Sequence, residues 1–595
     1  VEDTVAAALF GREIAKRQGA LSPRDLSSLA WAMAKMRADK AAFPPALAEG
    51  AVATIGRFNG QDLSNMVWAF AKVKADARVL FHAVASSALT VPDTFNAQEL
   101  SNLAWSFATL SMNETKLFHM LAHKAMDKAR EFRPQGLSNI AWSFATLASH
   151  HPELCGIIAE RAIEKTKEFS SQDMANLAWA FAVLAIRDDV LLHIMAEEAS
   201  AKIEAFNSQG LSNLAWAYAT LDAACPKLLD TLAERVAAKK YADFKTQEMS
   251  LIVWSFATLR LRHGESLTAT LAAVDAMMEE FNTVELSGLA WSLATLRIGT
   301  ERLLRGVFGQ SVRKANEFGA QGLSNVVWAA AKLSVGDEET MSALSRAVAA
   351  QARSFEPQGL STVAWAFASW GMEDGEVFRV IAGEALAKVA SFNPQELSSL
   401  GCALARSRIK AAPLLRGITA ELFVQLDKFN PLDLTNIAWS FAKHGEIMDG
   451  VPHAIANEAL VKLATFSPGQ LCTLAQSLAV LGIADARLFC AIGSRAVARL
   501  EDIEPGDRSV LVWSFAKVGV HEPRLFQAVG DGAAARLEDL SPSELSDVLW
   551  AYVTLDLLDC ALLRAAARHL CRELGALRVE GLPAEALPSL AADIR

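Results

Sequence analysis

The apolar and polar positions of this chain repeat every 37 residues. Tryptophan marks the register, with one step of 38 between Trp216 and Trp254, while Cys402 and Gln476 replace it in two units. A fixed period of this length predicts helical units stacked in tandem. The fifteen aligned positions are Trp31, Trp68, Trp105, Trp142, Trp179, Trp216, Trp254, Trp291, Trp328, Trp365, Cys402, Trp439, Gln476, Trp513 and Trp550.

Each unit opens with a helix-start signal such as "FNPQEL" (Phe392–Leu397). The order is a phenylalanine, a capping residue, proline and, two residues later, an acid, which together predict a capping box. The phenylalanine can staple onto a leucine further along the helix, as Phe95 can onto Leu100. The first helix therefore runs some fourteen residues, and its apolar stripe faces the second helix and the neighbouring units.

A polar break and a second amphipathic segment follow, for example "TKLFHMLAHKAMDKAREF" (Thr115–Phe132). Two helices per 37 residues predict an all-α fold, an α-solenoid superhelix of about fifteen tandem helix-turn-helix repeats. We expect these repeats over residues 21–575. Residues 1–20 then form the trailing helix of a truncated preceding repeat, and residues 576–595 a C-terminal tail or cap.

The tryptophan lies on the polar side of the first helix, with Gln98, Ser101, Asn102, Ser106 and Thr109 around Trp105. The ring can pack between successive first helices, or it can stack on bases. Because Cys402 and Gln476 replace it without breaking the register, packing is the favoured interpretation.

Two columns beside the tryptophan vary within a polar set, as expected of a modular reader of bases. The asparagine column lies three residues before the tryptophan, and the threonine–lysine column four residues after it. A solvated helix face is the alternative for any single residue. The base-contact candidates are Asn65, Asn102, Asn139, Asn176, Asn213, Asn325, Asn436, Lys72, Thr109, Thr146, Thr220, Lys332, Arg406, Lys443 and Lys517.

A basic column lies late in the second helix, fourteen residues before the tryptophan. Such a ladder can hold a phosphate chain along one edge. The alternative is ordinary helix C-terminal charge, with i,i+4 pairs such as Glu198–Lys202. The phosphate-contact candidates are Lys128, Lys165, Lys202, Lys240, Lys314, Lys388, Lys462, Arg499 and Arg536, preceded by Arg17.

The composition narrows the class of protein. The chain has 595 residues, 52% of them hydrophobic, so it can bury a large core. Its formal net charge is −10, so a polyanion site has to be a local stripe. The seven cysteines form no C-x-x-C pair and indicate reduced packing residues. No apolar run reaches membrane-span length, and no signal or transit peptide is visible.

Motifs for catalysis or cofactor binding are not found. We see no Gly-rich phosphate loop, H-E-x-x-H or G-x-S-x-G, so we expect neither an enzyme nor a cofactor. His119 and His123 are four residues apart, but no third ligand is in view, so we expect no metal site.

The motifs "LSNLAW" (Leu100–Trp105) and "FNPQELSSL" (Phe392–Leu400) resemble those of octotricopeptide repeat proteins. They are closer still to the 37-residue heptatricopeptide repeat proteins. The resemblance covers about residues 21–575 and implies an organellar protein of the mitochondrion or plastid that binds RNA. No C-terminal RAP domain is found, so the resemblance implies no nuclease-like activity.

We therefore expect an organellar protein that grips single-stranded RNA or rRNA, for RNA maturation, stability or translation, through repeated first-helix residues. The alternative is a non-catalytic protein–protein scaffold, such as a structural component of a mitochondrial ribosome or another organellar assembly. Electrostatics separates the two: unpaired basic side chains along one face favour RNA, and lysines neutralised by neighbouring acids favour a scaffold.

Overall fold

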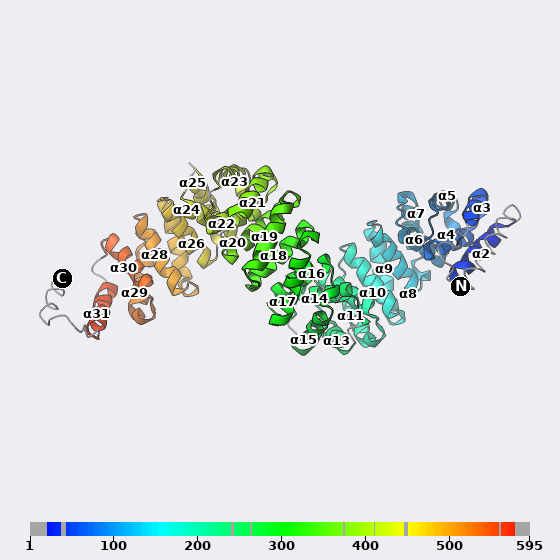
Figure 1. Cartoon of the computed structure of the whole chain (residues 1–595), viewed down its shortest axis with the longest axis horizontal. Helices are drawn as coiled ribbons and strands as arrows, with labels where there is room; N and C mark the ends of the chain where they lie inside the picture. Colours follow the sequence, from blue (N-terminus) through cyan, green and yellow to red (C-terminus); the bar gives the residue numbers. More distant parts are fainter. Residues whose placement is uncertain are drawn as a thin grey trace. The chain divides into compact units, whose positions relative to one another are not determined.

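The computed structural model describes residues 21–36, 43, 45–239, 243–261, 264–372, 375–409, 411–445, 450–557 and 561–576. Every regular element in these ranges is a helix, which confirms the all-α solenoid (Figure 1). The expectations for residues 1–20 and 577–595 lie outside the described residues. The chain divides into two compact units, Val1–Lys314 (unit 1) and Ala315–Arg595 (unit 2).

Unit 1 alternates the first helix of each repeat, the A helix, with the second, the B helix. Its A helices are α2 (Pro23–Lys35), α4 (Gly60–Lys72), α6 (Ala97–Thr109), α8 (Pro134–Thr146), α10 (Ser171–Val183), α12 (Ser208–Thr220), α14 (Thr246–Thr258) and α16 (Thr283–Leu296). Its B helices are α3 (Pro45–Thr54), α5 (Arg78–Ala88), α7 (Thr115–Asp127), α9 (Pro152–Lys165), α11 (Asp189–Ala201), α13 (Pro226–Ala238), α15 (Gly264–Ala276) and α17 (Glu301–Arg313).

Unit 2 continues the same alternation. Its A helices are α18 (Ala320–Leu333), α20 (Pro357–Trp370), α22 (Pro394–Ser407), α24 (Pro431–His444), α26 (Pro468–Val480), α28 (Pro505–Lys517) and α30 (Pro542–Thr554). Its B helices are α19 (Glu338–Gln351), α21 (Gly375–Ala387), α23 (Ala412–Gln425), α25 (Val451–Val461), α27 (Ala486–Ala498), α29 (Pro523–Ala535) and α31 (Ala561–Ala576).

Most A helices begin at the capping boxes that the sequence predicts, whereas α8, α12, α18, α20 and α28 have none. In α6 the Asn96 side chain accepts from the backbone N–H of Glu99 at 3.0 Å, and the Glu99 carboxylate accepts from the N–H of Asn96 at 2.9 Å. Two otherwise unpaired donors are thereby satisfied. In α8 glycine replaces the acid, and the Phe132 ring lies so close to Gly136 that an added Cβ would meet it at 2.8 Å.

The A helices end at a residue in the left-handed conformation. After α6, Ser111 has φ of 55°, the N–H of Ser111 donates to the carbonyl of Ala108, and that of Met112 donates to Phe107. This is a Schellman motif, which satisfies carbonyls at the helix end. Among the described residues this position is a non-glycine residue in ten repeats, so the tertiary packing imposes the left-handed conformation on ordinary side chains.

The B helices are shorter than the sequence pattern indicates. The segment expected as one helix to Phe132 leaves α-helical geometry after Asp127 and continues as a 3-10 turn, Ala129–Glu131. Phe132 is then extended, with φ of −68° and ψ of 136°. The B helix ends early for a physical reason: the chain must turn, and one residue must adopt an extended conformation, before the next A helix can begin.

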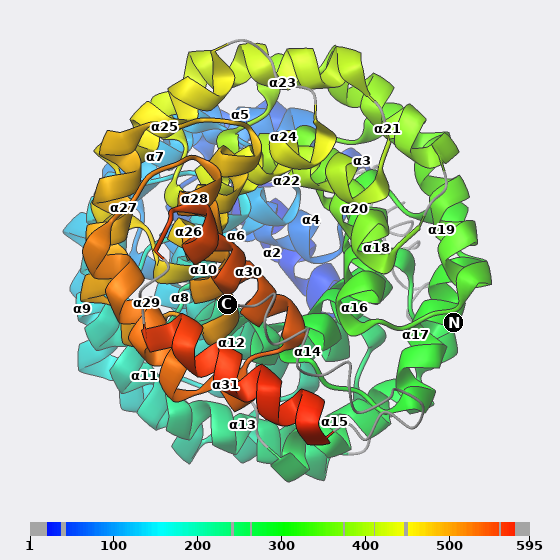
Figure 2. The ribbon, with the colours of Figure 1, turned by 90° about the vertical axis from the view of Figure 1, so that its left-hand side faces the viewer.

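Each unit consists of two layers, with the A helices packed side by side in one and the B helices in the other. Figure 2 shows the A helices from α4 to α14 on the inner side of unit 1 and those from α18 to α28 on the inner side of unit 2. The B helices between them in sequence lie outside. Aromatic rings join the layers, as where Phe81 of α5 meets Phe107 of α6 edge-on at 4.9 Å. Both rings are fully buried.

Neighbouring A helices are also tied by buried serines. Ser27 donates to the Asp62 carboxylate at 2.9 Å, so the capping acid of one repeat accepts from the repeat before it. Ser101 and Ser106, expected on the polar face, are 3% and 0% exposed. Their hydroxyls donate to carbonyls of their own helix, Gln98 and Asn102. The polar face is therefore narrower than helical periodicity alone predicts.

Candidate nucleic-acid interface

The asparagine column is half-buried along the A layer. Its candidate residues occupy A helices of both units, and five of them follow one another in α4, α6, α8, α10 and α12. In the part of the chain that the structure describes, none of these side-chain amides has a hydrogen-bond partner within the protein. An amide that is half-buried and unpaired is available to bond a base edge. The seven are Asn65, Asn102, Asn139, Asn176, Asn213, Asn325 and Asn436.

The threonine–lysine column lies on the same face and is mostly exposed. Only Thr109 among its candidates is half-buried, and its hydroxyl oxygen is buried without a hydrogen-bond partner. Within the described residues, none of its cations forms an ion pair with a carboxylate. Arg406 lies over the Trp439 ring, 5.8 Å from its centroid. The lysines are therefore available for phosphate or base contacts. The exposed members are Lys72, Thr146, Thr220, Lys332, Arg406, Lys443 and Lys517.

The tryptophans form a row between successive A helices within each unit. Trp254 and Trp291 have ring centroids 6.3 Å apart, and Trp513 and Trp550 are 6.1 Å apart. The inner members are half-buried, whereas Trp550 is 42% exposed. These contacts support packing as the main role, although each half-buried ring keeps part of its surface on the candidate face.

The columns of adjacent repeats interleave. Lys35 lies over two tryptophan rings, Trp31 at 5.4 Å and Trp68 at 5.5 Å, so it bridges two repeats by cation–π contacts. Cys402, at a tryptophan position, donates to the backbone carbonyl of Asn436 at 3.3 Å. A residue of the asparagine column therefore lies beside the tryptophan position of the preceding repeat.

A further polar column on this face was not singled out from the sequence. It lies seven residues before the tryptophan, is exposed in every repeat where it is glutamine, and projects from the first turn of the A helix. The signal was present in the sequence as a glutamine in nine of the fifteen repeats, but an exposed glutamine also suits a solvated surface. This glutamine column comprises Gln61, Gln98, Gln135, Gln172, Gln209, Gln247, Gln321, Gln358 and Gln395.

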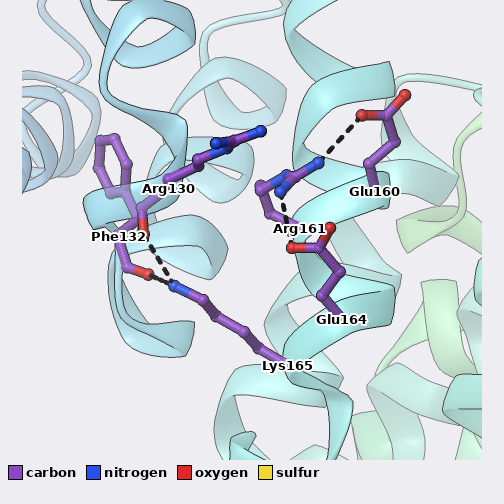
Figure 3. Close-up of polar contacts among 6 residues, drawn as sticks. All are labelled: Arg130, Phe132, Glu160, Arg161, Glu164 and Lys165. Atoms are coloured by element: carbon purple, nitrogen blue, oxygen red, sulfur yellow. Dashed lines mark hydrogen bonds and ion pairs between the residues drawn. The ribbon is translucent and has the colours of Figure 1, made fainter.

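The basic column has a different environment. Lys165 Nζ donates to the carbonyl of Phe132 at 2.6 Å and to that of Arg130 at 3.1 Å (Figure 3). Its ammonium group thus joins the end of α9 to the turn that leads into α8, the A helix of the same repeat. Beside it, Arg161 pairs with Glu164 at 2.7 Å.

Other members of the basic column repeat this bond. In each case the ammonium group donates to the phenylalanine carbonyl 33 residues earlier. Lys202 and Lys462 also pair with Glu198 and Glu458 at 2.9 and 2.8 Å. Where glutamine replaces lysine, Gln425 makes the same bond to Phe392 at 3.1 Å. The bonds are Lys128 to Phe95, Lys202 to Phe169, Lys314 to Phe281, Lys388 to Phe355 and Lys462 to Phe429.

The last members of the column behave differently. Arg499 pairs with Asp502 at 2.9 Å, and Arg536 is exposed. Lys240 and Arg17 lie outside the described residues. Because six ammonium groups are already bonded to carbonyls, this column ties the end of each B helix to the entry of the A helix in its own repeat. The second bond of Lys165, to Arg130, also reaches the turn that closes the repeat before. The column's contact with phosphate stays a prediction.

We expect Lys165→Met to destabilise unit 1 by about 1–2 kcal/mol, because two carbonyls lose a charged donor. The measurement is urea denaturation combined with hydrogen exchange around α8 and α9. The matched control is Lys167→Met, which removes an exposed lysine from the neighbouring turn. Equal stability of the two variants would contradict the bridging role. A slope of log affinity against log salt concentration that is shallower by about one, in Lys165→Met alone, would support a contact between Lys165 and an RNA phosphate instead.

The described histidine and cysteine side chains do not form a metal site. His151 lies edge-on to His119, with centroids 4.9 Å apart. Burial, with the nearby His119 and His123, lowers the pKa of His151. Among the described residues no group of three or more His, Cys, Asp or Glu is arranged to hold a metal ion. Burial raises the pKa of the Cys155 thiol to about 11. None of the described helices is long and apolar enough to serve as a membrane span.

Paired helices at a fixed period, stacked into two layers with one polar A face, define a helical-repeat protein of the α-solenoid class. The chain belongs to the family of the RNA-editing substrate-binding complex 6 protein. The sequence model of that family matches residues 7–263, 227–445 and 320–582. Among curated proteins, no sequence matches this chain.

Solved structures with low sequence identity also match over most of the chain. The pentatricopeptide repeat protein PPR10 from maize has 12% identity and a TM-score of 0.38, covering 95% of this chain and 91% of that chain. Importin13 in its cytosolic state has 11% identity and a TM-score of 0.28, covering 91% and 88%. A homology model of the full-length AP-3 complex has 10% identity and a TM-score of 0.29, covering 91% and 93%.

Proposed function

We propose that this chain binds single-stranded RNA along the A face and acts, without catalysis, in the maturation, stability or translation of organellar transcripts. The row of half-buried, unpaired asparagine amides carries the proposal. A purely structural face would pair these amides or replace them, because a half-buried amide without a partner loses hydrogen bonds to water. One base per repeat would give a footprint of about fifteen nucleotides at most.

Charge supports the same face. The threonine–lysine column offers unpaired cations at Lys72, Lys332, Lys443 and Lys517, while the basic column is largely bonded within the protein. Unpaired basic side chains along one face, the pattern expected of an RNA site, are therefore found, among the described residues, in the threonine–lysine column and not in the basic column. The name of the family, which refers to RNA editing and substrate binding, agrees with RNA as the ligand. From the tryptophan-centred motif we also propose that the repeats are related to octotricopeptide and heptatricopeptide repeats. The proposal includes a mitochondrial or plastid location.

A protein partner is the second candidate, and the outer layer of unit 2 favours it. Phe423 and Val424 of α23 are 49% and 73% exposed, and Val461 of α25, one repeat onward, is 78% exposed. Exposed apolar side chains at equivalent positions of neighbouring helices suit a protein contact. The two candidates use opposite layers, so they can coexist.

The direct test is ultraviolet crosslinking of the full chain in the organelle, with sequencing of the bound RNA and mapping of crosslinked peptides. We expect enriched transcripts and crosslinks on α4–α12. Recovery of proteins without any enriched RNA would sink the proposal and favour the scaffold.

A variant tests the amides themselves. Replacing Asn102, Asn139 and Asn176 together with alanine should weaken single-stranded RNA binding by roughly tenfold to a hundredfold, because bonds to base edges are lost. Fluorescence anisotropy at fixed salt measures the affinity. The control removes three hydroxyls from B helices in the same unit, by Ser86→Ala, Ser200→Ala and Thr268→Ala. Equal effects in both triple variants would count against base contact.

A further inference from the structure

A pocket of about 440 Å³ opens on the A face of unit 2, between α20 and α22. Its volume falls within the range of about 300–1,000 Å³ that is typical of small-ligand sites. Two half-buried tryptophans, Trp328 of α18 and Trp365 of α20, form its aromatic walls. The side chains that supply its polar lining include Gln358, Thr362, Gln395, Glu396 and Ser399.

The residues of the asparagine column change size at this place. Thr362 and Ser399 occupy positions that are asparagine in the repeats before and after, Asn325 and Asn436. Smaller side chains leave room between α20 and α22 that the longer amide fills elsewhere. The smaller Thr362 and Ser399 set these two repeats apart from their asparagine-bearing neighbours.

A carboxylate with a free oxygen lies at this pocket. Glu396 Oε2 accepts from the backbone N–H of Asn393 at 2.9 Å, as the capping box requires. Within the described residues, the other carboxylate oxygen has no hydrogen-bond donor. Between the next two A helices, α22 and α24, the corresponding serine and acid are bonded: Ser398 donates to the Asp433 carboxylate at 3.2 Å. The equivalent Ser361 donates to the carbonyl of Gln358 at 3.0 Å, as Ser398 also does to Gln395, and among the described residues it makes no bond to the Glu396 carboxylate.

The Thr362 hydroxyl is also committed as a donor, whereas the Ser399 hydroxyl has no hydrogen-bond partner among the described residues. Thr362 donates to the backbone carbonyl of Gln358 at 2.7 Å, so only its lone pairs face a ligand. The pocket thus combines two indole rings with acceptors at Glu396 and Thr362 and with the Ser399 hydroxyl, which can donate or accept. The exposed amides of Gln358 and Gln395 add donors at the rim.

We propose that this pocket is a subsite for one unpaired guanine of the bound RNA. The inference rests on the proposed RNA binding and specifies it at one position. Guanine alone presents two adjacent donors, N1–H and N2–H₂, on its Watson–Crick edge, which suit the Glu396 carboxylate. Adenine and cytosine place a ring acceptor beside the amino group, and uracil offers a single ring N–H. A purine also gives more stacking area on Trp365 than a pyrimidine.

The test measures binding of the full chain to fifteen-residue oligouridylates with a central G, A, C or U. We expect the G oligonucleotide to bind at least about tenfold tighter than the all-U one, as one hydrogen bond to a charged group allows. Glu396→Gln should reduce this ratio to within about twofold. The capping box survives this change, because Gln470 with Ser467 forms the same box in α26.

The matched control is Glu99→Gln, at the same capping position of α6. It removes the same charge from the A face, so any general gain in RNA affinity cancels in the ratio of G to U binding. A wild-type chain that binds all four oligonucleotides equally overturns the guanine subsite and leaves RNA binding intact. An unchanged ratio in Glu396→Gln also overturns the subsite. Failure to bind any oligonucleotide overturns both proposals.

Discussion

Replacing Lys332, Arg406, Lys443 and Lys517 together with glutamate is expected to lower the affinity for single-stranded RNA by on the order of a hundredfold or more at 0.15 M salt. The reason is that each position loses a counterion-releasing contact and gains repulsion from the phosphates. All four side chains are exposed, and none forms an ion pair with a described carboxylate, so the fold should persist. Circular dichroism and thermal melting check this directly.

The matched control reverses four cations on B helices of the same unit, Arg346, Arg379, Arg416 and Arg524. All four are exposed, so the change in net charge is the same. We expect only a small loss of affinity, by long-range repulsion that salt screens. If both quadruple variants weaken RNA binding alike across a salt titration, net charge governs binding, and the A face has no special role.

Phe107→Ala is expected to destabilise unit 1 by about 3–5 kcal/mol, because a fully buried ring is replaced by a cavity. The change also removes the edge-on contact with Phe81, which joins α6 to the preceding B helix. In a solenoid each repeat contacts only its neighbours, so the damage should be local. Hydrogen exchange should rise most in α4–α8 and least in α14 and α16.

Phe107→Leu is the control, since Leu293 and Leu478 occupy the same position of other repeats. A branched aliphatic chain refills most of the cavity, and we expect a much smaller loss of stability. Uniform loss of protection over all of unit 1 would contradict local coupling and indicate that the unit unfolds as one cooperative block.

Much of the fold was predictable because the signals are local. A capping box, a proline and a periodic apolar stripe act within one helix, and the structure confirms them at Asn96 and Glu99. The end of the B helix was not predictable in the same way. The segment to Phe132 keeps helical periodicity, but the entry into the next A helix requires an extended residue.

The candidate face was only partly predictable. Helical geometry places Asn102 and Thr109 on one side of α6, and both lie on the candidate face. The same geometry also places Ser101 and Ser106 toward that side, yet both are buried. Periodicity gives an angle on one helix, whereas burial depends on which neighbouring helix covers that angle.

The repeat, its two helices and its polar columns are therefore properties that the sequence by itself determined. Only the tertiary structure separated two kinds of positive charge. Lys165 and Lys443 are indistinguishable as sequence letters, but Lys165 reaches the carbonyl of Phe132 at the start of its own repeat, while Lys443 is exposed and forms no ion pair within the described residues. The physical reason is that the long, flexible lysine side chain can bond a carbonyl 33 residues away in the sequence. Only the packing of the helices determines which carbonyl lies within its range.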